Sequence, residues 1–135
     1  DRMKGEQRAD WTGLERSAVS GDLVPAPDPS DPDHYASSDA NYAHMNFKAY
    51  ASAIDAYPDG HFDVVMVDGR ARTSCLVHAL PKLRKGGLLI LDNAEREHYT
   101  VKNGAVLDRL EPILQGMAPV IFNRDFSETR ILRKR

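Results

Sequence analysis

Three oxygen-bearing side chains follow two apolar segments in the second half of this 135-residue chain. Asp68 comes directly after the segment 62–67, and Asp92 and Asn93 come directly after the segment 88–91. If both segments are neighbouring parallel strands, their carboxyl ends meet at the sheet edge where open α/β folds bind ligands. Two carboxylates and an amide oxygen suit Mg²⁺ or a similar ion. Turns and helix caps, which often use Asp and Asn, are the simpler explanation of the spacing alone.

Basic residues stand in the loops after the same two segments. Arg70 and Arg72 follow the first segment, and Arg96 and His98 follow the second. They could bind a carboxylate or phosphate group of a substrate, although isolated basic loop residues are more often only solvated. We interpret the single cysteine, Cys75, as a small core residue of a helix rather than a nucleophile. One cysteine forms no internal disulfide, which fits a reducing cytoplasm.

The elements that would position these groups alternate clearly after residue 60. The runs 62–67 and 88–91 are apolar and predict strands that are buried on both faces of a parallel sheet. Between them we expect a helix that begins at Thr73 or Ser74. The glycine pair Gly86-Gly87 then ends this helix and leads into the second strand.

The last third of the chain extends the pattern. Apolar residues at helical spacing predict a helix from about Ala105 to Gln115, and strands over 119–122 and 128–132 then form a hairpin. This order predicts an α/β fold with a doubly wound, mostly parallel sheet and an antiparallel C-terminal strand. We expect residues 1–135 to form a single domain.

The first 60 residues are more polar. Repeated prolines exclude helix and interior strand, so we expect an exposed loop over 26–46. Asn46 then caps a helix over 47–57. Weaker patterns precede the loop, namely a helix over 2–19 and a short strand over 21–25.

Composition argues against two classes of partner. The net charge of -2 at pH 7 disfavours a nucleic acid, because binding to phosphates needs a basic face. No apolar run approaches the roughly 20 residues that cross a bilayer, so we expect no membrane partner.

Two segments together resemble the fourth and fifth strands of the class I S-adenosylmethionine-dependent methyltransferases. Phe62–Gly69 is a strand that opens with Phe-Asp. Leu80–Asn93 is a helix ending in Leu-x-x-Gly-Gly, followed by a strand that ends in Asp-Asn. The resemblance covers about residues 47–135, and the closing pair of strands is similar to the family's antiparallel seventh strand. It implies a Rossmann-like fold and disfavours a plain nicotinamide-binding one.

The resemblance implies methyl transfer from S-adenosylmethionine to a small-molecule acceptor, at oxygen. In the metal-dependent members, residues that match Asp68, Asp92 and Asn93 hold a divalent cation such as Mg²⁺. The resemblance therefore assigns a metal to these three residues and a catalytic role to Asp68 and Asp92. It also places Asp68, Gly69 and Arg70 at the cofactor. Arg70 stands where lysine is usual, and because arginine stays protonated, the general base has no assigned residue.

One part of the family pattern has no counterpart in the sequence. The family's first strand and its glycine-rich turn bind the methionine end of the cofactor, and this sequence contains no Gly-x-Gly. In the family's strand order, 3-2-1-4-5-7-6, the loss of strands one and two exposes the edge of the segment 62–67. We therefore expect an N-terminally incomplete domain of a longer polypeptide, or a chain whose edge is covered by a partner or a second copy.

Two further functions stay open. The chain could be a catalytically inactive methyltransferase-like module that acts through protein–protein association at the open sheet edge. It could also be part of a different nucleotide-binding Rossmann-like enzyme. A glycine-rich turn upstream of Asp1 would distinguish the enzyme, which we expect in the cytoplasm, from the inactive module.

Overall fold

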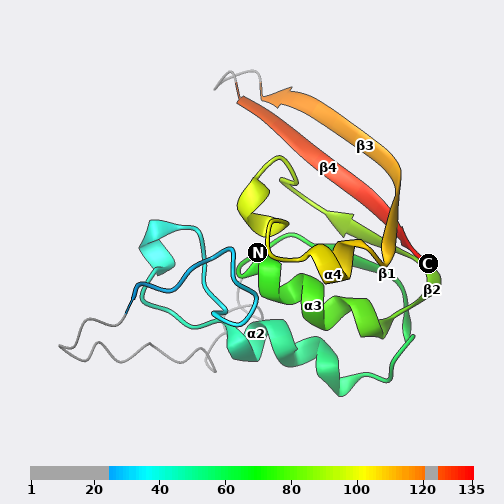
Figure 1. The fold of residues 1–135 in the computed structure, drawn as a ribbon, viewed down its shortest axis with the longest axis horizontal. Coiled ribbons are helices and arrows are strands. Elements are labelled where there is room, and N and C mark those ends of the chain that lie inside the picture. Colours follow the sequence, from blue (N-terminus) through cyan, green and yellow to red (C-terminus); the bar gives the residue numbers. More distant parts are fainter. Residues whose placement is uncertain (1–24, 121–124) are drawn as a thin grey trace, which may run out of the picture.

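The computed structural model describes residues 25–120 and 125–135 (Figure 1). The helices are α2 (Lys48–Ser52), α3 (Arg72–Lys82) and α4 (Gly104–Leu107). The strands are β1 (Phe62–Val67), β2 (Leu83–Leu91), β3 (Leu110–Val120) and β4 (Asp125–Lys134). There are also short 3₁₀ turns: η2 (Ala40–Tyr42) before α2, η3 (Ala53–Ala56) after α2, and η4 (Glu97–Tyr99) between β2 and α4.

The strands form one mixed sheet in the order β1-β2-β4-β3. β1 and β2 are parallel, and β4 is antiparallel to both β2 and β3, so β3 runs in the direction of β1 and β2. The general α/β class, the strand over 62–67 and the closing hairpin are thereby confirmed. Figure 1 shows that the C-terminal part of β3 and the N-terminal part of β4 project away from the helices.

The hydrophobic core lies on one face of the sheet. Val67 of β1 and Leu89 of β2 are almost completely buried and pack against α3 at Leu76. On the opposite face, Val64 and Met66 of β1 are 49% and 59% exposed. Within the described residues, the helices cover only the first face. The predicted burial of β1 on both faces is therefore wrong for the described structure, whereas the doubly wound arrangement stays a prediction.

The junction of α3 and β2 differs from the expected one. Leu83, which is fully buried, already has an extended backbone, so α3 ends at Lys82 rather than at the glycine pair. Gly86 and Gly87 lie within β2, where its pairing with β1 shifts register. Gly86 has a positive φ of 77°. A Cβ atom on Gly87 would lie 2.9 Å from the carbonyl oxygen of Asp63, so the close approach of β1 requires glycine.

The predicted helix over 105–115 is wrong. Only Gly104–Leu107 is helical, and the chain enters β3 at Leu110. Pro112 explains the difference, because in a helix its ring would remove an N–H and clash with the carbonyl group four residues earlier. β3 tolerates this proline because the strand lies at an edge of the sheet and its pairing shifts register beside Pro112.

The segment expected to be an exposed loop is held against the N-terminal end of α3. Thr73 and Ser74, which we expected to start this helix, lie in its first turn and are 1% exposed. Their hydroxyl groups donate to the carbonyl oxygens of Pro29 and Pro32 at 2.8 and 2.7 Å. The helix itself begins at Arg72.

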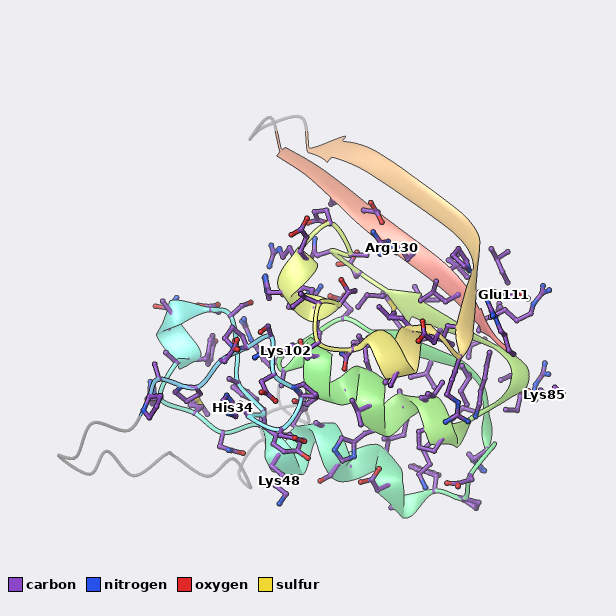
Figure 2. All side chains as sticks on the ribbon, in the orientation of Figure 1. His34, Lys48, Lys85, Lys102, Glu111 and Arg130 are labelled. Atoms are coloured by element: carbon purple, nitrogen blue, oxygen red, sulfur yellow. The ribbon has the colours of Figure 1, made fainter. Side chains whose placement is uncertain are left out.

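Two salt bridges from Lys102 also hold this segment in place. The Nζ atom of Lys102, which is labelled in Figure 2, lies 2.6 Å from Asp28 and 3.5 Å from Asp31. Further along the segment, Ala36 and Ser37 are buried. The segment is therefore partly packed against the rest of the protein, which the proline pattern alone did not predict.

The N-cap of the helix predicted over 47–57 is Phe47 rather than Asn46, and Phe47 makes no side-chain cap hydrogen bond. Asn46 lies one residue earlier, and its side-chain oxygen accepts a hydrogen bond from the backbone N–H of Lys48 at 2.9 Å. The helix is present as α2 followed by η3. The patterns over 2–19 and 21–25 lie outside the described residues, apart from residue 25. No helix within the described ranges is long and apolar enough to cross a membrane.

Candidate functional site

Asp68, Asp92 and Asn93 lie together at the carboxyl ends of β1 and β2. The pairing of Val67 with Leu91 sets the two following loops side by side, and the backbone N–H of Asp92 donates to the carbonyl oxygen of Val67 at 3.2 Å. Asn93 turns the chain with a left-handed φ of 52°, which asparagine tolerates better than most residues. The parallel register of the two strands thus brings together the residues that the sequence singled out.

These three side chains converge on the guanidinium group of Arg72. Its Nη2 donates to Asp68 Oδ1 and its Nη1 donates to Asn93 Oδ1, both at 3.0 Å. Nη1 also lies 3.9 Å from Asp92 Oδ2. Two backbone carbonyl oxygens accept further hydrogen bonds, that of Asp92 from Nη1 at 2.5 Å and that of Gly69 from Nε at 3.1 Å. One cation therefore ties the ends of β1 and β2 together.

Local structure directs this arginine into the site. Ala71, which precedes α3, has a left-handed φ of 45°, a conformation that is uncommon for a residue with a Cβ atom. The four-residue spacing from Asp68 to Arg72 then allows their ion pair. The Arg72 side chain is only 10% exposed. Sequence analysis grouped Arg72 with the residues that could bind a substrate anion. Its four-residue spacing from Asp68 was the sequence feature that pointed instead to an ion pair within the protein.

A divalent ion does not fit this arrangement. Asp68 Oδ1 and Asn93 Oδ1 already accept hydrogen bonds from Arg72, and the positive charge of Arg72 would repel a second cation. In the part of the chain that the structure describes, no group of three or more His, Cys, Asp or Glu side chains could hold a metal. The metal assignment to Asp68, Asp92 and Asn93 stays a prediction of the resemblance, and this geometry disfavours it.

A polar cavity of about 390 Å³ lies beside the Arg72 cluster. Its charged and hydroxyl-bearing walls include Ser38, Asp39, Arg70, Arg72, Arg96 and Tyr99. Arg70 Nη1 lies 2.9 Å from Asp39 Oδ2, and its guanidinium group stacks 4.2 Å from the centre of the Tyr42 ring. The backbone N–H of Asn41, and also Arg70, hold the pKa of Asp39 below its usual value. Asp39 therefore stays ionised, and Arg70 is already paired.

Arg96 is the most exposed of the three arginines in this cavity, at 49% of its side chain. Its Nη1 donates to the hydroxyl oxygen of Tyr99 at 3.3 Å, and its Nε lies 3.7 Å from Glu95. His98 does not line the cavity. Burial, and then the charge of Arg96, lowers the pKa of His98, which favours the neutral imidazole. Of the basic residues in the two loops, Arg96 is therefore the best placed to meet an anion.

A second, mainly apolar cavity of about 420 Å³ lies between β1, α3 and the α2–η3 segment. Its apolar walls include Ala53, Ile54, Val65, Val67, Cys75 and Ala79, while Tyr50, Asp68 and Gly69 add polar groups. Burial raises the pKa of the Tyr50 hydroxyl and raises that of the Cys75 thiol to about 12. Gly69 lines both cavities, so the two adjoin at this residue. Asp39, Tyr50 and Tyr99 belong to this region without any signal in the sequence that we recognised.

No protein-family model matches the chain, and no curated protein matches it either. The sheet order, the Arg72 cluster and the two cavities therefore carry what can be inferred about function.

Proposed function

We propose that the chain has a class I methyltransferase fold and takes part in methyl transfer from S-adenosylmethionine to an oxygen atom of a small-molecule acceptor. The order of the strands carries this proposal. The order β1-β2-β4-β3, in which β4 alone is reversed, corresponds to strands 4-5-7-6 of the methyltransferase order. The common dinucleotide-binding sheet, by contrast, has the strand order 3-2-1-4-5-6, without a reversed strand between its last two strands.

The apolar cavity suits the adenine end of the cofactor. It lies at the carboxyl end of β1, where open α/β sheets bind ligands, and its volume is within the range of about 300–1,000 Å³ for ligand pockets. Ile54 and Val67 would contact the ring, and the carboxylate of Asp68 could accept a hydrogen bond from its amino group. Asp68 and Gly69 would thus serve the cofactor, whereas Arg70 lines the polar cavity.

The polar cavity suits the methyl acceptor. It adjoins the apolar cavity at Gly69, so an acceptor oxygen and the cofactor could lie next to each other, as attack on a methyl group requires. Its hydroxyl groups, and the guanidinium group of Arg96, are donors for an acceptor that carries hydroxyl or acidic groups.

Calorimetric titration of S-adenosylhomocysteine into the chain tests this proposal. We expect micromolar binding, and we expect Ala53→Trp to weaken it about tenfold or more, because the exposed Ala53 lines the apolar cavity and an indole ring there would block it. Ala56→Trp is the matched control, since Ala56 is also exposed in η3 but lies outside the cavity walls. No binding by the folded wild-type chain would contradict the proposal, as would equal effects of the two variants.

A second candidate is a catalytically inactive module that acts through protein–protein association. Among the described strands β1 forms one edge of the sheet, and its Val64 and Met66 side chains are 49% and 59% exposed. An edge strand with exposed apolar side chains can pair with an extended segment of another chain or of a second copy.

Sedimentation velocity over a range of concentrations tests self-association through this edge. The module predicts reversible dimers that Met66→Lys weakens, because a lysine side chain on an edge strand disfavours pairing with another strand. Val101→Lys is the control, since Val101 is 67% exposed and lies outside the sheet. A wild-type chain that stays monomeric at high concentration would exclude association between copies.

A further inference from the structure

We propose that the guanidinium group of Arg72 is the permanent cation of this site and takes the place of a divalent ion between Asp68, Asp92 and Asn93. This inference rests on the proposed methyltransferase function, because it states how the site would bind an acceptor oxygen without a metal. The geometry that supports it lies within the described loops after β1 and β2.

The first support is the set of oxygens that Arg72 has as partners. Asp68 Oδ1, Asn93 Oδ1 and the backbone oxygen of Asp92 all accept hydrogen bonds from the guanidinium group, and Asp92 Oδ2 lies 3.9 Å from it. The other carboxylate oxygen of Asp92 accepts a hydrogen bond from Thr129 of β4 at 3.1 Å. These are the three residues that the resemblance assigns to the ion, and each of them already has one side-chain oxygen that accepts a hydrogen bond from a protein group.

The second support is that Arg72 is held in one orientation. Its side chain is 10% exposed, and its guanidinium carbon lies 5.1 Å from the centre of the Tyr99 ring. The left-handed backbone of Ala71 sets the position at which α3 begins. Because Arg72 is the first residue of α3, it also sets the direction in which the Arg72 side chain leaves the backbone. A cation that is fixed before the ligand arrives binds it without the loss of side-chain freedom.

The third support is a donor that remains for a ligand. A guanidinium group has five N–H donors, and four of the Arg72 donors bind Gly69, Asp92, Asn93 and Asp68. Nη2 donates to Asp68 with one hydrogen and carries a second, and Arg72 lines the polar cavity. This N–H can donate to an oxygen atom of the acceptor. Arg72 would thus hold the acceptor oxygen where a metal-dependent enzyme uses its ion.

Titration with Mn²⁺, followed by electron paramagnetic resonance, tests this inference on the full chain. The wild-type protein should bind no Mn²⁺ below millimolar concentrations. Arg72→Ala should gain a site of submillimolar affinity, because the variant frees the oxygens of two carboxylates and an amide. Adding Asp92→Asn to Arg72→Ala should remove that site. Circular dichroism of each sample shows whether it is folded.

Two results would overturn the inference. One is tight Mn²⁺ binding by the wild-type chain that Asp92→Asn abolishes, since the ion would then bind beside Arg72. The other is a folded Arg72→Ala variant that gains no Mn²⁺ site. If Arg72→Ala does not fold, Arg72→Gln replaces it in the same titration, because glutamine keeps an amide donor but has no charge to repel the ion.

The same samples separate this inference from the proposed function. Wild-type protein that binds neither S-adenosylhomocysteine nor Mn²⁺, while Arg72→Ala gains the Mn²⁺ site, would leave Arg72 as the cation of a site with another function. Wild-type protein that binds both ligands, with the Mn²⁺ lost in Asp92→Asn, would overturn the role of Arg72 alone.

Discussion

At the scale of single residues, Thr73 shows how a buried hydroxyl group fixes a proline-rich segment. Its Oγ1 lies 2.8 Å from the carbonyl oxygen of Pro29 and 3.3 Å from that of His98. We predict that Thr73→Val lowers the free energy of unfolding by about 1–3 kcal/mol, because the two part-buried carbonyl oxygens lose the one hydrogen that the hydroxyl group can donate. Thr100→Val is the control and should change stability by less than about 0.5 kcal/mol, because the Thr100 hydrogen bond is exposed. Urea denaturation measures both, and equal effects would contradict this account.

Cys75 gives a second prediction at this scale. Burial raises the pKa of its thiol from 9.0 to about 12, so the native protein should react with iodoacetamide at pH 8 about a thousandfold more slowly than the unfolded chain. Because the folded state holds this proton more tightly, the stability that Cys75 contributes is present below pH 9 and is lost as the pH rises towards 12. The chain has one cysteine, so mass spectrometry follows the reaction directly. Native and denatured rates that agree would refute the prediction.

At the scale of elements, the bulge in β2 depends on Gly87. A Cβ atom there would lie 2.9 Å from the carbonyl oxygens of Asp63 and Arg84, and backbone atoms cannot move aside as a side chain can. We predict that Gly87→Ala destabilises the protein by about 1–3 kcal/mol. Gly104→Ala has open space around the added methyl group at the start of α4, so it should be neutral or stabilise by up to about 1 kcal/mol. Thermal unfolding of the two variants tests this difference in stability. Similar melting temperatures for Gly87→Ala and Gly104→Ala would contradict the prediction.

The sequence predicted correctly those elements that depend on the residue types within the element itself. The run 62–67 predicted β1 with its observed bounds, because its apolar, β-branched residues suit a strand. The prediction of a helix over 105–115 was wrong because it relied on the helical spacing of apolar residues and gave too little weight to Pro112. The convergence of Asp68, Asp92 and Asn93 followed from parallel pairing alone. The hydrogen bonds from Arg72 to those oxygens did not, because the four-residue spacing from Asp68 allows an ion pair, but the position of the arginine also depends on the left-handed backbone before α3, for which the sequence shows no marker.

At the scale of the whole molecule, the sheet divides the described protein into a covered face and an open one. α3 buries Val67 and Leu89, whereas Met66 on the other face is more than half exposed. The polar cavity lies where the loops after the parallel strands meet residues 36–39, and the apolar cavity lies between β1, α3 and the α2–η3 segment. Charge and apolar spacing could not predict the polar cavity, because the segment 25–47 is held against α3 by tertiary hydrogen bonds such as that of Ser74.

The central claim is that the apolar cavity beside Asp68 binds the adenine end of S-adenosylmethionine. The most direct measurement is a nuclear magnetic resonance titration of the isotope-labelled chain with S-adenosylhomocysteine, following the backbone amides. The account predicts saturable shifts at Ile54, Asp68 and Gly69 and none at the far end of the β3–β4 hairpin. A folded chain whose Ile54, Asp68 and Gly69 amides stay unchanged at millimolar ligand would contradict it.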